Sequence, residues 1–302
     1  MPIIPFWFPV SNWRFQSKDC LLLCVFRTRP ERTLEDMAVL SVDLAFRCWS
    51  DLGVVVLSRA TARHASSPVT CEILPFAPPG IDGAKDRGSV DPEILAGRLN
   101  HLCAVRDIRI MMLDGPQAWK SASNGLKHAR VSERQLNTAA KTGLPGMVKP
   151  VTYRTFAEFC MDVYDALCRR GWRRLETRPQ PSLPNLTGTA RERILVESYP
   201  HAAWKSLGLK PLPAKRRARV SDLAEAYGAL RAIIPFISSR PPNHDQLQAI
   251  VGGLPGLALE EQNTAGLRIV GNPPRREHGH WREGFIVLPL PPQTASGVRW
   301  LH

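Results

Sequence analysis

Short apolar runs that alternate with helical patterns constrain the fold of this chain more than any other feature. Residues 38–42, 52–58 and 69–74 are apolar or β-branched stretches of strand length. A helix is expected after Asp91, where Pro and Glu follow a capping Asp, and residues 108–113 form another apolar run. This order of elements predicts an α/β domain with a central sheet.

The second half of the chain continues the alternation. We expect helices over residues 155–167, 200–207 and 220–230 and after Asn243, and strands over 194–196, 266–270 and 285–288. Residues 115–150 are polar, Gly-rich and basic, which predicts a long functional loop with a short helix near 132–140. Residues 1–36 lack periodicity, so we interpret them as an irregular N-terminal arm or a start codon assigned too early, and residues 37–302 as the folded domain.

The charge of the chain favours a polyanionic partner. It has 302 residues with 40 Lys and Arg against 27 Asp and Glu, a net charge of +13. Nucleic acid, an anionic membrane or a phosphorylated ligand would complement this charge, and the alternative is a soluble basic protein without such a partner. One basic run, predicted to follow a nucleic-acid backbone unless it is a solvated loop, comprises Lys215, Arg216, Arg217 and Arg219.

Composition also bears on the compartment. No apolar run approaches the roughly 20 residues of a membrane span, and the first ten residues lack the basic start of a secretory signal. The 7 Cys are an odd number without a regular framework, as in proteins of reducing compartments. We therefore expect a soluble, cytoplasmic protein with no membrane partner; its oligomeric state is left open.

Acidic residues follow three of the expected strands. Asp43, Asp114 and Glu197 end apolar runs, and Asp245 opens a late helix. Acids at strand ends of an open α/β sheet face the crevice where ligands bind, and several carboxylates there repel one another unless a divalent cation lies between them. Oxygen ligands select Mg²⁺ or Mn²⁺, and two such ions could promote phosphodiester cleavage. The alternative is that each acid forms a turn or caps a helix.

Four segments resemble Domain-of-Unknown-Function family 429, a family of predicted nucleases with an RNase H-like fold. They are VLSVD at 39–43, LDGP at 113–116, VESYPHAAW at 196–204 and HDQLQA at 244–249, in the family's order over about residues 38–260. The segment RVSERQL at 130–136 also resembles a basic-acidic loop motif of the family. The resemblance implies an RNase H-like mixed sheet flanked by helices in residues 37–302, with Asp43, Asp114 and Glu197 as catalytic metal ligands and Asp245 as an auxiliary ligand.

One position departs from the family pattern. The family has a second Asp where this chain has Gln248, and an amide cannot supply the negative charge of a carboxylate. Gln248 is expected to share a helix face with Asp245 and to face the crevice. We expect a metal-dependent nuclease that hydrolyses phosphodiester bonds in DNA or RNA. The alternative is a non-catalytic nucleic-acid or partner-binding protein with a degraded RNase H-like site. The chain lacks the phosphate-loop, dinucleotide and nucleophile-elbow motifs of several other enzyme classes.

Overall fold

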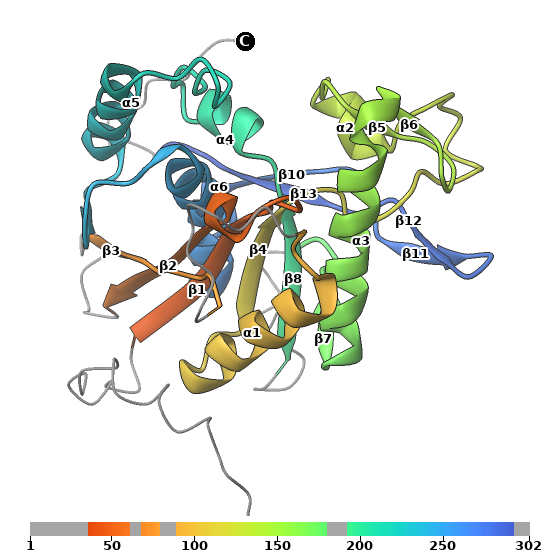
Figure 1. Cartoon of the computed structure of the whole chain (residues 1–302), viewed down its shortest axis with the longest axis horizontal. Helices are drawn as coiled ribbons and strands as arrows, with labels where there is room; N and C mark the ends of the chain where they lie inside the picture. The colour runs from red at the N-terminus through yellow and green to blue at the C-terminus, as the bar shows by residue number, and fades with distance from the viewer. Residues whose placement is uncertain (1–35, 61–67, 79–88, 180–191, 293–302) are drawn as a thin grey trace, which may run out of the picture. The chain divides into compact units, whose positions relative to one another are not determined.

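A computed structural model describes residues 36–60, 68–78, 89–179 and 192–292 (Figure 1). Every element below belongs to one compact unit, residues 36–302. The arm expected over residues 1–36 lies outside the described residues, except for Asp36, which begins the first strand.

The described residues alternate strands and helices as the sequence predicts. The strands are β1 Asp36–Asp43, β2 Gly53–Ala60, β3 Val69–Ile73, β4 Ile110–Asp114, β5 Lys141–Thr142, β6 Val148–Lys149, β7 Trp172–Arg174, β8 Arg193–Ser198, β9 Phe236–Ser238, β10 Leu267–Val270, β11 Arg275–Glu277, β12 His280–Arg282 and β13 Ile286–Pro289. The helices are α1 Pro92–Val105, α2 Val131–Gln135, α3 Arg154–Arg169, α4 Pro200–Ser206, α5 Val220–Ile233 and α6 His244–Glu260, with 3-10 turns at Trp49–Asp51, Val151–Tyr153 and Thr264–Gly266.

The central sheet is mixed. Its strand order is β10–β13–β8–β4–β1–β2–β3–β9, and β7 also pairs with β8. Strand β2 runs antiparallel to both β1 and β3, whereas β4 runs parallel to β1 and β8 runs parallel to β4. Three strands in an antiparallel meander, followed by two parallel ones, form the core of an RNase H-like sheet. The predicted fold class is confirmed.

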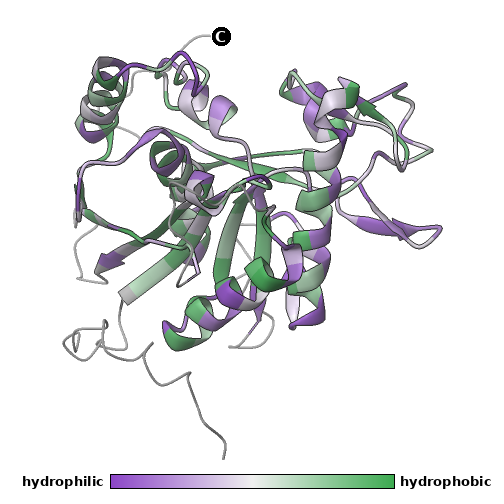
Figure 2. Cartoon of the chain, in the orientation of Figure 1, coloured by the Kyte–Doolittle hydropathy of each residue, from purple (hydrophilic) through white to green (hydrophobic). Residues whose placement is uncertain are grey.

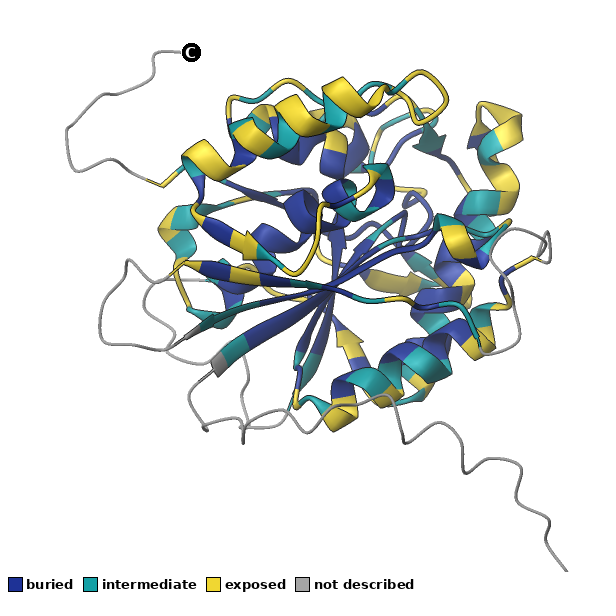
Figure 3. Ribbon diagram, turned by 60° about the vertical axis from the view of Figure 1, so that its left-hand side comes forward, coloured by how far each residue is buried: buried dark blue, intermediate teal, exposed yellow. Residues whose placement is uncertain are grey.

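Helices cover both faces of this sheet (Figures 1 and 3). Alternate residues of β1 point to opposite faces, so Leu40 and Val42 pack with residues of α1 and α3, whereas Val39 packs with residues of α4 and α6. Helix α6 lies very close to the sheet at Gly253, where an added Cβ would lie 2.7 Å from the Cβ of Ser41. None of the helices in the described ranges is long and apolar enough to cross a membrane.

The predicted long loop folds into a small substructure. It contains α2 and the β5–β6 hairpin, which pairs Thr142 with Val148. Helix α2 is shorter and begins earlier than the helix expected near residues 132–140. A second hairpin, β11–β12, lies between the closing strands and is strongly hydrophilic, in contrast to the hydrophobic central strands (Figure 2).

Candidate active site

Asp43 and Asp114 lie side by side at the carboxyl ends of neighbouring parallel strands. They are register partners between β1 and β4, so their side chains extend from the same face of the sheet. A hydrogen bond joins their carboxyl groups. Because one carboxyl must be protonated to donate this bond, the pair shares a proton when no cation lies between its members.

Burial and mutual repulsion shift the titration of this pair. Burial raises the pKa of Asp43 well above its ordinary value, and the charges of Asp114 and Asp245 raise it further. Burial raises the pKa of Asp114 to about 7; the hydrogen bond with Asp43 opposes this rise and the charge of Glu197 adds to it. Full ionisation of the pair is therefore disfavoured, and a bound cation would relieve the repulsion between the two carboxylates.

Asp245 approaches the pair from the first turn of α6. Asn243 caps this helix by accepting a hydrogen bond from the backbone N–H of Gln246 at 2.9 Å. The start of the helix packs on β2 at Gly53, the register partner of Asp43. A Cβ on Gly53 would lie 2.2 Å from the backbone oxygen of Asp245, so this close approach requires glycine. Gly53 therefore allows Asp245 to lie near Asp43.

Lys215, the first residue of the predicted basic run, forms ion pairs with two acidic side chains, and its role as a nucleic-acid contact stays a prediction. Its Nζ donates to Asp51 Oδ1 at 2.8 Å and to Asp245 Oδ2. Partial burial alone would lower the pKa of Lys215, but the two carboxylates hold it above its ordinary value. The remaining members of the predicted basic run are all exposed and likewise keep that role as a prediction: Arg216, Arg217 and Arg219.

Glu197 lies outside the carboxyl pair. It is the register partner of Leu113 and not of Asp114, so its side chain extends from the opposite face of the sheet. Arg130 binds both of its carboxylate oxygens, from Nη1 at 2.7 Å and from Nη2 at 2.6 Å. The backbone N–H of Gln117 donates to Oε2 at 3.1 Å. With these three bonds, Glu197 is a buried anchor for the segment that follows β4.

The buried Arg130 connects that anchor to the rest of the segment. Its Nε donates to Glu133 Oε1 at 3.2 Å and to Thr142 Oγ1 at 3.1 Å. Glu133 in turn accepts from the backbone N–H groups of Arg130 and Thr142. Another buried acid, Glu283, accepts from the backbone N–H of Val131 at 2.8 Å. Sequence reasoning flagged this segment through the motif at 130–136 but did not predict the ion pair.

Gln248 does not face the carboxylates, so the expectation placed on it is wrong. Its Oε1 accepts a hydrogen bond from the indole N–H of Trp204 at 2.8 Å, and Trp204 is fully buried. Trp204 therefore directs the amide toward α4, although Gln248 lies only three residues after Asp245.

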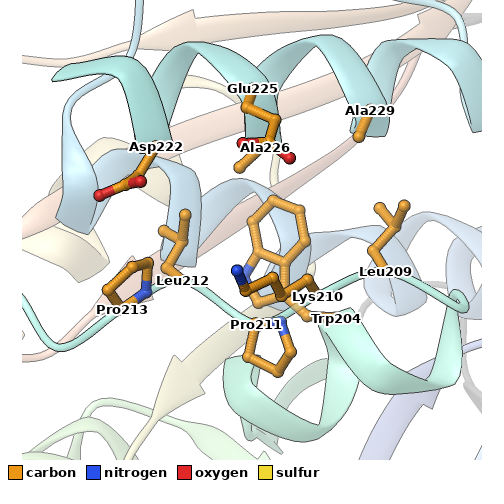
Figure 4. Close-up of a pocket in the computed structure, with 10 residues that line it drawn as sticks. All are labelled: Trp204, Leu209, Lys210, Pro211, Leu212, Pro213, Asp222, Glu225, Ala226 and Ala229. Atoms are coloured by element: carbon orange, nitrogen blue, oxygen red, sulfur yellow. The ribbon is translucent and has the colours of Figure 1, made fainter. Parts of the chain in front are cut away.

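A small pocket lies between residues 209–213 and α5 (Figure 4). Its volume is about 60 Å³, and Trp204, Lys210 and Glu225 contribute to its lining. None of the predicted site residues lines it.

The donor set fits a hard divalent cation at the carboxyl pair. In the described part of the chain, no three His, Cys, Asp or Glu side chains lie close enough together to hold a metal ion. Asp43 and Asp114 are nevertheless adjacent oxygen donors with raised pKa values, as expected of a site that a cation would neutralise. Both carboxylate oxygens of Glu197 already accept hydrogen bonds from Arg130 and Gln117, so they do not fit the role of metal ligands.

The fold and the strand-end acids place the protein in the class of RNase H-like α/β proteins. No model of a protein family matches the chain, and no curated protein matches it. Similar solved structures include RuvC of Thermus thermophilus and the same protein in complex with a Holliday junction substrate, at 10% and 11% identity. Each covers 74% of this chain and 96% of the RuvC chain, with a TM-score of 0.34. The fold assignment rests on the strand order of the sheet.

Proposed function

We propose that this protein is a metal-dependent nuclease of Domain-of-Unknown-Function family 429 that hydrolyses phosphodiester bonds in nucleic acid. The observation that carries the proposal is the hydrogen-bonded carboxyl pair of Asp43 and Asp114 at the ends of parallel strands. Asp245 adds a third negative charge from α6. Acids gathered at this edge of an open α/β sheet support a role in binding a cation and a substrate.

Asp43 and Asp114 would hold Mg²⁺ or Mn²⁺, with Asp245 as an auxiliary ligand. When bound, such a cation supplies Lewis acidity and lowers the pKa of a water molecule. Lys215 holds Asp245 in place and offsets part of the negative charge that would otherwise repel a phosphodiester. Glu197 acts through Arg130, because their ion pair fixes the segment that leaves β4 directly after Asp114.

The net charge of the chain supports a nucleic-acid substrate. A protein with +13 net charge attracts a polyanion and releases its counterions on binding. The arginines at 216, 217 and 219 follow Lys215, which reaches the acidic site, and Arg216 and Arg217 are exposed to solvent. DNA and RNA both satisfy this requirement, so both are included in the test.

The test is cleavage of single-stranded and duplex DNA and RNA by the full chain with Mn²⁺ or Mg²⁺. Asp43→Asn and Asp114→Asn should each lower the cleavage rate at least about 100-fold, since each removes charge from the proposed cation site. Asp107→Asn is a matched control, because Asp107 is exposed and its left-handed backbone (φ 48°) suits Asn. Cleavage that persists in EDTA, or that survives both substitutions, would contradict the proposal.

A non-catalytic nucleic-acid-binding protein is the second candidate. Two ion pairs favour it, because Arg130 neutralises Glu197 and Lys215 neutralises Asp245, two of the acids expected to bind metal. This candidate predicts binding of nucleic acid that EDTA leaves unchanged, without cleavage under any metal condition. The first candidate predicts cleavage that depends on added metal.

A further inference from the structure

The segment that follows β4 concentrates positive charge. Residues 115–153 contain six Lys and Arg and one acid, Glu133. Glu133 is buried and bound to Arg130 and Thr142, so it does not offset the charge at the surface. Three of the cations, Lys127, Arg134 and Lys149, are exposed.

The lysines of this segment gather around one histidine. Slight burial and then the charges of Lys149, Lys127 and Lys120 lower the pKa of His128, so each of these cations lies within electrostatic reach of that ring. Lys120 is buried and donates to the backbone oxygen of Ser121 at 2.8 Å. Within the described ranges, neither Lys127 nor Lys149 forms an ion pair with an acid. Like charges held together without counterions are typical of a surface that binds a polyanion.

Exposed apolar side chains flank Lys149 in the sequence. Leu144 and Met147, in the turn of the β5–β6 hairpin, are 37% and 49% exposed, and Val151 just after the hairpin is 77% exposed. Large exposed apolar residues elsewhere on the described surface are separated in the sequence, but these three fall within eight residues. A cluster of this kind marks an interaction site more often than single exposed residues do.

The hairpin is fixed beside the proposed active site. The segment leaves β4 immediately after Asp114, and the Arg130–Glu197 ion pair ties it to the end of β8. Below the hairpin, Val148 packs with Trp119, Ala157 and Met161 in a small core of its own. Figure 1 shows α2, β5 and β6 beside the N-terminal end of α3. The basic and apolar groups are therefore presented on an ordered support.

We propose that residues 120–151 form a nucleic-acid-binding surface that is selective for accessible bases, an inference that rests on the proposed function. Lys127 and Lys149 contact phosphates, and Leu144 and Met147 pack against bases that are single-stranded or unstacked. Apolar side chains of this type insert between base steps in proteins that distort nucleic acid. The positive charge selects the polyanion, and the apolar turn selects strands whose bases are open.

The experiment measures binding of the full chain, in EDTA, to fluorescein-labelled oligonucleotides of equal length. Single-stranded DNA, single-stranded RNA and a blunt duplex are titrated over a range of salt concentrations. Lys127→Gln/Lys149→Gln should reduce the slope of log affinity against log salt by about 1.4 for single strands, at roughly 0.7 per phosphate contact. Leu144→Ser/Met147→Ser should weaken single-strand binding about tenfold with an unchanged salt slope and little effect on duplex.

Two matched controls separate this surface from others. Arg216→Gln/Arg217→Gln removes two exposed charges from the basic run near Asp245. Val105→Ser removes an exposed apolar side chain (68%) from the end of α1. All variants change side chains at the surface, so their melting temperatures should equal that of the wild type. Thermal unfolding checks this. Val105→Ser should bind as the wild type does.

Three outcomes would overturn the inference. The first is a salt slope that falls in the arginine variant and not in the lysine variant. The second is an equal loss of duplex and single-strand binding in the Leu144/Met147 variant. The third is equally tight binding to polyglutamate, which would assign the surface to an acidic protein. Because binding is measured without metal, a failed cleavage assay contradicts the nuclease proposal alone, whereas a wild type that binds no nucleic acid in EDTA contradicts the binding-surface proposal alone.

Discussion

Substitution of Arg130 by Met should destabilise the protein strongly at neutral pH. Arg130 and Glu197 are buried, with side chains 1% and 4% exposed, and two short hydrogen bonds join them. Without Arg130, the carboxylate of Glu197 keeps the Gln117 N–H and loses its counter-charge. Removal of one partner from a buried ion pair typically costs about 3–5 kcal/mol.

Protonation of Glu197 limits this cost and makes it depend on pH. Burial already raises the pKa of Glu197 above its ordinary value of 4.5, although Arg130 opposes the rise, so loss of Arg130 should raise this pKa further. Protonation of a group with an ordinary pKa of 4.5 costs about 3.4 kcal/mol at pH 7 and about 0.7 kcal/mol at pH 5, at 1.36 kcal/mol per unit. A carboxyl with a raised folded-state pKa loses stability as pH rises, so the deficit of the variant should grow from pH 5 to pH 7.

Urea unfolding at pH 5 and pH 7 measures both effects. Arg130→Met should lose about 3 kcal/mol or more at pH 7 relative to the wild type, and clearly less at pH 5. The double variant Arg130→Met/Glu197→Gln, which has no buried charge at position 197, should lose less at pH 7 than the single variant and show little change between the two pH values. A loss below about 1 kcal/mol at pH 7, or an equal loss at both pH values, would refute the anchoring role.

Three further predictions concern the acidic site and its neighbours. In EDTA, the wild type should lose stability as pH rises from about 4 to about 7, because the raised pKa of Asp114 gives the folded state an extra proton. Asp114→Asn should reduce this dependence of stability on pH, measured by thermal unfolding. An unchanged dependence would contradict the shared proton. Lys215→Met should lower the dissociation constant for Mn²⁺, measured by calorimetry, because the metal ion no longer competes with the Lys215 ammonium for Asp245. Unchanged affinity would show that Asp245 takes no part in binding the metal ion. Gln248→Asp should leave the affinity for Mn²⁺ unchanged. It should lower the free energy of unfolding by about 1–3 kcal/mol, because the shorter side chain loses the hydrogen bond from the buried Trp204 N–H. Tighter Mn²⁺ binding would show that position 248 reaches the site.

The fold could be predicted from local patterns. The apolar runs that end at Asp43 and Asp114 correspond to β1 and β4, and their parallel pairing follows from the α/β order. Asn243 begins α6 as its capping chemistry predicts. Each of these signals lies within a few residues, so a single sequence contains it.

The parts of the site that escaped prediction depend on register and on contacts between distant segments. Asp114 is the last residue of β4, whereas Glu197 is the last but one of β8 and pairs with Leu113; a shift of one residue directs a strand side chain to the opposite face. The strand-end pattern does not specify that register. Likewise, the contact between Lys215 and Asp245 joins residues thirty positions apart, and α5 and β9 lie between them in the chain.

The central claim is that Asp43 and Asp114 together bind a divalent cation. An anomalous difference map from crystals of the full chain soaked in Mn²⁺ tests it most directly. The account predicts a manganese peak between these two carboxyls, absent in Asp43→Asn crystals, with the Arg130–Glu197 ion pair intact. An empty carboxyl pair at saturating Mn²⁺, or a peak at Glu197 with Arg130 displaced, would contradict it.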